Sequence, residues 1–540
     1  MIQIIGKEDY YMLNVYHLVR AFFPNEEVKQ QVNSEQEAHV QFVQNGNSCF
    51  SIMIPETEPE KGQSSRKQYL TLKAFDALTE FTGKSLAWGI LTGVRPTKIA
   101  TKALEAGKND TAIVRELEQQ YRISKERANL ALQVARREQE VLSSVDWENG
   151  FSLYVNIPFC PSICSYCSFA SGEIGRWEKQ IDEYIKSLEK ELRLIGEKVG
   201  KDTGRKVLHT IYIGGGTPTS LTSIQLERVL QAIDRTFSME TLREYTVEAG
   251  RPDSITEDKL KVLRSFPVTR ISINPQTMQQ KTLDQIGRKH SVLAVKEAFH
   301  LARKWGFDNI NMDLMIGLPG EALREVVDTL EQIRVLSPES LTVHPLAIKR
   351  GTQFRQERLI NHQGKCLSNP LLHQKKHLDN QLPHQRKYHV NLLSQQSTRF
   401  SEECEDNGRN LLGYHRKFFD HKENVDGGNV GGNSCWLSEV DEVEKMARAC
   451  FETAQEMNLS PYYLYRQKNI AGNLENIGYA KAGKEGFYNI LMMEEKQTIY
   501  AAGAGAVTKI VGADGSIKRI ENAKNIETYM GRLVSSIVPR

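Results

Sequence analysis

The chain has 540 residues, of which 40% are hydrophobic and 25% are charged, and its formal net charge is +3. Such a length allows about three domains, since a domain commonly has about 100 to 200 residues. The composition is that of an ordinary globular protein, and so small a charge argues against a polyanionic partner such as nucleic acid.

The N-terminus shows no targeting segment. Residues 1–20 lack a basic region followed by an apolar core and a cleavage site, so we expect no secretory signal. No uninterrupted apolar stretch approaches the roughly 18 residues of a membrane span. The eight cysteines, three of them in one short loop, fit metal ligation in a reducing compartment better than a disulfide framework. We therefore expect a cytoplasmic protein without a membrane span.

Residues 1–148 are predicted to form an N-terminal α/β domain. The chain opens with a strand and a helix over 2–23, and it continues through the apolar runs AHVQFV and CFSIMI. A helical pattern then extends from Lys67 to Leu142. A polar stretch over 55–68 indicates a loop within this domain.

Residues 149–350 alternate short β-branched or aromatic runs with amphipathic helical stretches. This pattern is typical of repeated βα units around a parallel sheet. Six such units with polar residues at the strand ends favour a partial (β/α)6 barrel of the TIM type, with its site at the carboxyl ends of the strands. The predicted strands cover residues 151–157, 207–215, 243–250, 269–276, 309–317 and 340–347.

Residues 351–436 interrupt the pattern. They are rich in Asn, Gln, His, Lys and Ser, and they contain seven of the 13 histidines. No core-forming period survives in them, so we predict a polar, disordered insertion, with a metal site on its histidines as the alternative. Residues 437–540 return to a helical period and then alternate strands with Gly-rich turns, which predicts a mixed α+β C-terminal domain.

The sequence YVNIPFCPSICSYCSF places Cys160, Cys164 and Cys167 directly after the first predicted strand of the barrel. A C-x3-C-x2-C loop offers three thiolates, so a four-iron cluster held there would keep one iron open to a small molecule. By spacing alone, a structural zinc site with a fourth ligand from elsewhere fits equally well.

More polar groups follow at the ends of the later strands. GGGTPT over 214–219 either brings backbone groups close to a ligand or forms a tight turn. Beyond it stand four side chains that could bind hydroxyl, amino and carboxylate groups, although each alone could be a capping or salt-bridge residue. They are Glu248, Gln276, Arg288 and Asp313.

Taken together, these motifs resemble the radical S-adenosylmethionine (SAM) superfamily. The segments IPFCPSICSYCSF, GGGTPT, VEAGRP, RISINPQ, GRKH and NMDLMIGLPGE are similar to the oxygen-independent coproporphyrinogen III oxidases, also called coproporphyrinogen dehydrogenases. LAWGILTGVRPTK and PYYLYRQKNIAGN resemble the form with an extra N-terminal domain. The likeness covers most of the chain outside the insertion.

The resemblance implies a [4Fe-4S] cluster on Cys160, Cys164 and Cys167. The implied reaction converts two propionates of coproporphyrinogen III into vinyls, giving protoporphyrinogen IX in haem biosynthesis. A 5′-deoxyadenosyl radical from SAM would start it, and a separate electron donor would reduce the cluster. Eight residues are implied to bind SAM: Tyr154, Gly215, Gly216, Thr217, Glu248, Gln276, Arg288 and Asp313.

Phe169 departs from this family. The enzymes that define the activity often have a fourth cysteine at its place, whereas the related haem-chaperone-like branch has the same phenylalanine. A haem-binding carrier of the same fold is therefore the second hypothesis, and a radical SAM enzyme with another substrate is the third.

A substrate with four carboxylates should meet cationic residues at the mouth of the barrel. By motif context the candidates are Arg95, Lys98, Arg466 and Lys468, each of which could equally be a surface or capping residue. The GAGA segment over 503–506 either lets backbone approach the cofactor or macrocycle, or forms a plain β-turn.

Overall fold

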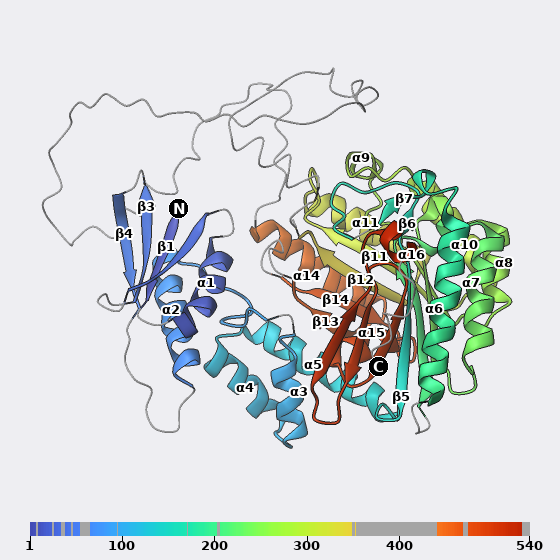
Figure 1. Ribbon diagram of the computed structural model, residues 1–540. Coiled ribbons are helices and arrows are strands. Elements are labelled where there is room, and N and C mark those ends of the chain that lie inside the picture. Colours follow the sequence, from blue (N-terminus) through green and yellow to red (C-terminus); the bar gives the residue numbers. More distant parts are fainter. Residues whose placement is uncertain are drawn as a thin grey trace, which may run out of the picture. The chain divides into compact units, whose positions relative to one another are not determined.

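The computed structural model (Figure 1) describes the chain outside several gaps. Except for Thr352, the predicted insertion lies outside the described residues, and so do most of the predicted polar loop over 55–68 and Lys468. All described residues belong to one unit of the chain. They are 1–6, 9–23, 26–33, 38–44, 47–54, 65–93, 95–169, 171–201, 206–347, 352, 440–467 and 474–531.

The first strands form a small sheet of their own. It has the order β2-β1-β3-β4, in which β1 and β2 are parallel and the other pairs are antiparallel. Ile4, Leu18, Leu70 and Phe75 are buried between this sheet and two helices. The elements are β1 (Ile2–Gly6), α1 (Asp9–Phe22), β2 (Val28–Val32), β3 (His39–Gln44), β4 (Asn47–Met53) and α2 (Arg66–Thr82).

Three helices lead from this sheet to the larger one. The side chains of Asn109 and Ser124 accept hydrogen bonds from backbone amides in the first turns of α4 and α5, and so cap these helices. Before them, Trp88 is fully buried and its indole N–H donates to the carboxylate of Glu475 at 2.6 Å. The helices are α3 (Lys98–Glu105), α4 (Asp110–Tyr121) and α5 (Lys125–Ser143).

The larger sheet has eleven strands in the order β13-β14-β12-β11-β10-β9-β8-β5-β15-β16-β17. Its six central strands are parallel and follow one another in chain order, which confirms the predicted α/β fold with a partial (β/α)6 barrel. They are β5 (Gly150–Ile157), β8 (Val207–Gly215), β9 (Glu244–Gly250), β10 (Arg270–Ile273), β11 (Ile310–Ile316) and β12 (Ser340–Pro345).

Helices connect these strands, and α6, α7, α8 and α10 stand along their outer face (Figure 1). A short separate pair, β6 (Phe159–Cys160) and β7 (Gly172–Glu173), follows β5. The connecting elements are η1 (Ile174–Arg176), α6 (Ile181–Lys201), η2 (Pro218–Ser220), α7 (Ser223–Thr236), η3 (Pro252–Ser254), α8 (Glu257–Arg264), α9 (Gln280–Gln285), α10 (Val292–Lys304) and α11 (Leu323–Leu336).

The C-terminal strands join both edges of the six. β15 lies parallel beside β5, and β14 lies antiparallel beside β12. The boundaries of the predicted domains stay predictions. The remaining elements are α14 (Val440–Glu456), β13 (Ser460–Tyr465), β14 (Asn476–Ala480), α15 (Phe487–Glu494), β15 (Thr498–Ala502), β16 (Val507–Val511), β17 (Ile517–Glu521) and α16 (Ile526–Gly531).

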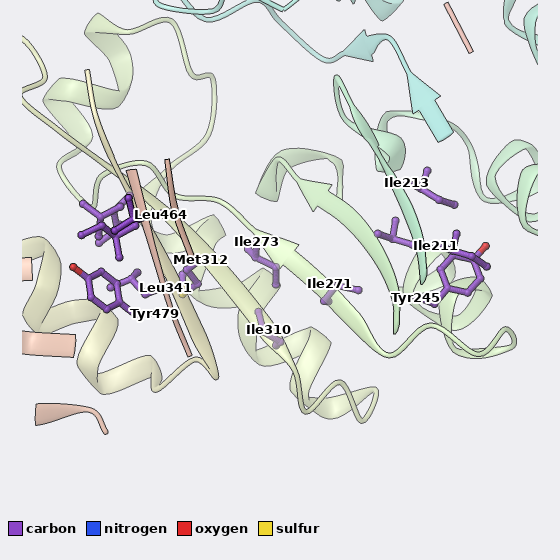
Figure 2. Close-up of a cluster of buried hydrophobic side chains, with 14 of the residues drawn as sticks. Ile211, Ile213, Tyr245, Ile271, Ile273, Ile310, Met312, Leu341, Leu464 and Tyr479 are labelled. Atoms are coloured by element: carbon purple, nitrogen blue, oxygen red, sulfur yellow. The ribbon is translucent and has the colours of Figure 1, made fainter. Parts of the chain in front are cut away.

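Alternate residues of the central strands face opposite sides of the sheet. Figure 2 shows one set, which is apolar and includes Ile211 and Ile213 of β8 and Ile271 and Ile273 of β10. The other set is polar and forms hydrogen bonds across the strands, such as Thr210 to Ser152 at 2.7 Å. The central strands therefore have one dry face against the helices and one polar inner face.

No helix in the described part of the chain is long and apolar enough to cross a membrane.

The GAGA segment forms the turn between β15 and β16, against the end of β5. The Gly503 amide donates to the Glu191 carboxylate at 2.8 Å, and the Ala504 carbonyl accepts from the Asn156 side chain at 2.5 Å. Gly503 has φ +104°, where only glycine is unstrained, and a Cβ on it would lie 2.5 Å from the Asn156 carbonyl oxygen.

Replacing Gly503 with alanine should therefore lower the free energy of unfolding by about 1–3 kcal/mol. Gly175→Ala is the matched control, because that glycine has no left-handed φ and a Cβ on it meets nothing within 4 Å. Thermal or denaturant unfolding of both variants measures the effect. Equal stability of the two variants would contradict this account of the turn.

Candidate functional site

The cysteine loop is fastened to the end of β8 by backbone hydrogen bonds. The amide of Gly216 donates to the Ile157 carbonyl at 2.8 Å, and the amide of Thr217 donates to the Phe159 carbonyl at 2.7 Å. Farther along, the Ser165 amide donates to the Ile286 carbonyl at 3.1 Å. These bonds hold the loop at the carboxyl ends of the strands, where the site was predicted.

Glycine at positions 215 and 216 permits these backbone hydrogen bonds between the cysteine loop and the end of β8. Gly215 has φ +107°, and a Cβ there would overlap the side-chain oxygen of Asn156. A Cβ on Gly216 would lie 2.6 Å from the carbonyl oxygen of Phe159. The GGGTPT glycines thus allow two parts of the chain to approach each other closely.

The three cysteines of the loop are free thiols with partly accessible side chains. Burial raises the pKa of the Cys160 thiol, while a hydrogen bond from the Thr217 hydroxyl, 3.6 Å from the sulfur, opposes the rise. The other two thiols also raise this pKa. Within the described ranges, no three His, Cys, Asp or Glu side chains gather as a single metal ion requires.

Two guanidinium groups approach the sulfur of Cys164. Nη1 of Arg251 lies 3.8 Å from it and Nη1 of Arg288 lies 3.9 Å from it. A guanidinium can donate hydrogen bonds to a thiolate, which is the form of cysteine that ligates metals. The three thiols and these cations therefore fit a cluster ligated by cysteine thiolates.

Glu248 lies on the polar inner face at the end of β9. It accepts a hydrogen bond from the Tyr212 hydroxyl and another from the Gly215 amide. Burial raises the pKa of Glu248 to about 7, and nearby Asp313 adds to the rise, while the two hydrogen bonds oppose it. At neutral pH this carboxyl group can therefore both accept and donate hydrogen bonds.

Gln276, Arg288 and Asp313 lie at the same end of the barrel. β10 ends at Ile273, earlier than predicted, and beyond it Gln276 takes φ +67° and forms an isolated parallel bridge with Leu314 of β11. The Gln276 amide then donates to the Asp313 carbonyl at 3.0 Å. The Arg288 guanidinium, 5% exposed, donates to the Asn274 carbonyl at 2.6 Å, and its Nε has no hydrogen-bond partner among the described residues.

Three tyrosine rings stack inside the barrel. The rings of Tyr154 and Tyr212 have centroids 6.2 Å apart, and Tyr488 of α15 lies 4.5 Å from Tyr212. The Tyr154 hydroxyl donates to the Asn156 side chain at 3.0 Å. Tyr212 and Tyr488 were not predicted, although the polar alternation along β8 could have indicated Tyr212.

The two arginines predicted to bind substrate have other partners. Arg95 pairs with Glu495 at 2.6 Å and also donates to the Met493 carbonyl. Arg466 is buried, donates to the Leu91 carbonyl and lies over the Trp88 ring. Both guanidiniums thus join N-terminal to C-terminal segments, and their contact with a substrate stays a prediction. Lys98 is exposed at the start of α3.

Comparisons with known proteins match this architecture. The family model described as the radical SAM superfamily matches residues 154–333. The chain is 35% identical over 486 residues to the "oxygen-independent coproporphyrinogen-III oxidase-like protein HemZ" of Bacillus subtilis, covering 89% of this chain and 81% of that protein. The chain belongs to this family of radical SAM proteins. Members of the superfamily bind a [4Fe-4S] cluster and SAM.

Other relatives of this radical SAM protein match a shorter region. The "heme chaperone HemW" of Bacillus subtilis is 39% identical over 38% of this chain and 52% of its own length. The "oxygen-independent coproporphyrinogen III oxidase" of Helicobacter pylori is 35% identical over 36% of this chain and 41% of its own. The solved coproporphyrinogen III oxidase HemN of Escherichia coli is 17% identical, with a TM-score of 0.45 over 72% of this chain and 70% of its own.

The raised pKa of Glu248 gives a test. Between about pH 4.5 and 7 the folded state keeps a proton that the unfolded state releases, so stability should fall as the pH rises, by up to about 3 kcal/mol. Glu248→Gln has no such proton. Its stability relative to the native protein should therefore increase by this amount over the same range, measured by denaturant unfolding without cofactors. Parallel pH profiles would contradict the assignment.

Proposed function

We propose that this protein catalyses the oxygen-independent oxidative decarboxylation of coproporphyrinogen III to protoporphyrinogen IX. The observation that carries this proposal is the extent of the likeness to the oxidase-like HemZ, which covers 89% of the chain. The heme chaperone of the same organism matches only 38% of it. The N-terminal part of the chain is thus shared with the oxidase-like relative.

The proposed cluster ligands are Cys160, Cys164 and Cys167. With SAM bound, the cluster would supply the chemistry of hydrogen-atom abstraction. For each propionate, the adenosyl radical would take one hydrogen atom, and loss of carbon dioxide and of one electron to a separate one-electron acceptor would leave a vinyl group. The chain itself has to hold the methionyl and adenosyl parts in place.

The described residues support this binding role. Arg288 is buried, and its Nε is available to pair with a carboxylate. Glu248, as part of the polar inner face, can accept hydrogen bonds from ribose hydroxyls. We assign the remaining SAM contacts to Tyr154, Gly215, Gly216, Thr217, Gln276 and Asp313, which come from the inner face or the carboxyl ends of the same strands.

A haem carrier is the second candidate. Phe169, where the oxidases often have a fourth cysteine, is 72% exposed at the end of the cysteine loop. An exposed aromatic ring beside the cluster site is suited to contact a flat apolar ligand. The heme chaperone relatives add to this alternative.

An anaerobic assay of the reconstituted protein with reductant, SAM and coproporphyrinogen III separates the candidates. We expect both 5′-deoxyadenosine and protoporphyrinogen, detected chromatographically. Deoxyadenosine without a porphyrin product would indicate another substrate and contradict the proposal. Stoichiometric haem uptake without turnover would favour the carrier.

Cys164→Ala should abolish both the cluster absorption and SAM cleavage, because a three-thiolate site loses one ligand. Cys450→Ala is the control, since Cys450 is buried in α14 outside this site. Iron content and deoxyadenosine formation measure the effect. A Cys164→Ala protein that keeps both would refute the ligand assignment.

A further inference from the structure

Arg251 is a buried guanidinium that no cofactor role yet uses. It directly follows β9, in the segment VEAGRP, and is 3% exposed. Gly250, with φ +58°, turns the chain at this point, and the Arg251 amide donates to the Ala249 carbonyl at 2.7 Å. The side chain therefore leaves the end of the strand toward the cysteine loop.

All three nitrogens of the Arg251 guanidinium are engaged. Nε and Nη2 bind the two oxygens of Asp253 at 2.9 and 2.8 Å, a bidentate pair that fixes the plane of the group. Nη2 also donates to the Ser162 hydroxyl at 3.1 Å, and Nη1 donates to the Ser162 carbonyl at 3.4 Å. So held, Nη1 lies 3.8 Å from the sulfur of Cys164.

The groups that contact the proposed cluster ligands differ in charge between Cys160 and Cys164. Cys160 has the neutral hydroxyl of Thr217 at its sulfur, whereas Cys164 has the guanidiniums of Arg251 and Arg288. Among the described contacts of Arg251, Arg288 and His290, the carboxylate is that of Asp253. Burial and the two guanidiniums lower the pKa of His290 to about 3, so its imidazole is neutral. The Cys164 side therefore carries a net positive charge.

The reduction potential of an iron–sulfur cluster depends on net charge and on hydrogen bonds to its sulfurs. Positive charge stabilises the reduced cluster, which carries one more electron. A buried charge acts strongly because little water screens it. Arg288 is already proposed to bind SAM, so Arg251 is the cation left to act on the cluster alone.

We propose that Arg251 is a positioning residue for the cluster, whose guanidinium, fixed by Asp253 and Ser162, donates to the Cys164 sulfur and raises the reduction potential. This inference rests on the cluster site of the proposed function. It concerns the one-electron reduction that has to precede SAM cleavage.

The test compares Arg251→Gln and Arg251→Lys with the native protein, each reconstituted with iron and sulfide. Arg251→Gln removes the positive charge. Arg251→Lys keeps the charge but lacks the planar guanidinium that pairs with both oxygens of Asp253. Arg228→Gln is the control, because Arg228 lies on α7 and pairs with Asp182 and Glu189. The midpoint potential is read by a redox titration monitored by electron paramagnetic resonance, with iron and sulfide counted in each sample.

For Arg251→Gln we expect at least a tenfold smaller equilibrium constant for reduction, which lowers the midpoint potential by about 59 mV. Arg251→Lys should lie closer to the native potential, and Arg228→Gln should match it. A complete cluster in Arg251→Gln with the native potential would overturn the inference while leaving the proposed function intact. If even the native protein binds no cluster, the proposed function itself fails.

Loss of the cluster is also decisive. If Arg251→Gln binds no iron but Arg251→Lys does, with the native circular dichroism in both, the charge is required at Cys164 and the inference stands. If both variants lose the cluster equally, Arg251 acts only through the hydrogen bonds by which its guanidinium holds the cysteine loop in place. That result would overturn the electrostatic role.

Discussion

The backbone hydrogen bonds that join the end of β5 to the end of β8 determine where the cysteines lie. There, the carbonyls of Ile157 and Phe159 accept hydrogen bonds from the amides of Gly216 and Thr217. This joint requires glycine at 215 and 216, because a Cβ at either position would collide with Asn156 or Phe159. Without this close approach, the loop could not fold over the carboxyl ends of the strands. The site therefore depends on the absence of two side chains as much as on three thiols.

The alternation of the central strands supplies the rest of the site. Their apolar residues pack under the helices, which leaves polar residues and tyrosines for the inner face. At the opposite end from the cysteines, Glu244 accepts hydrogen bonds from the amides of Phe487 and Tyr488 at 2.6 and 3.3 Å. This cap at the start of α15 holds the Tyr488 ring against Tyr212. Apolar packing on the outer face thus stabilises the barrel, and the polar groups that can bind ligands lie on the inner face.

The sequence predicted the six strands because each has an uninterrupted local pattern, and it missed what depends on distant partners. Gln276 has a left-handed backbone beyond the end of β10 and pairs with Leu314 of β11, an arrangement that no local period indicates. The pairing of β15 with β5 joins segments more than 300 residues apart. Arg95 and Arg466 were candidates both for substrate contact and for surface or capping roles, because a cation in a motif looks the same whether it binds a ligand or a carbonyl. Arg251 was not predicted, because its contacts with Ser162 and Cys164 join segments 87 to 89 residues apart.

The central claim is that Cys160, Cys164 and Cys167 alone hold a four-iron cluster whose remaining iron binds SAM. A crystal structure of the reconstituted protein with SAM, determined without oxygen, tests it most directly. The account predicts three cysteine sulfurs on three irons, and the amino and carboxylate groups of SAM on the fourth. A fourth protein ligand on the cluster, or SAM bound away from the cluster, would contradict it.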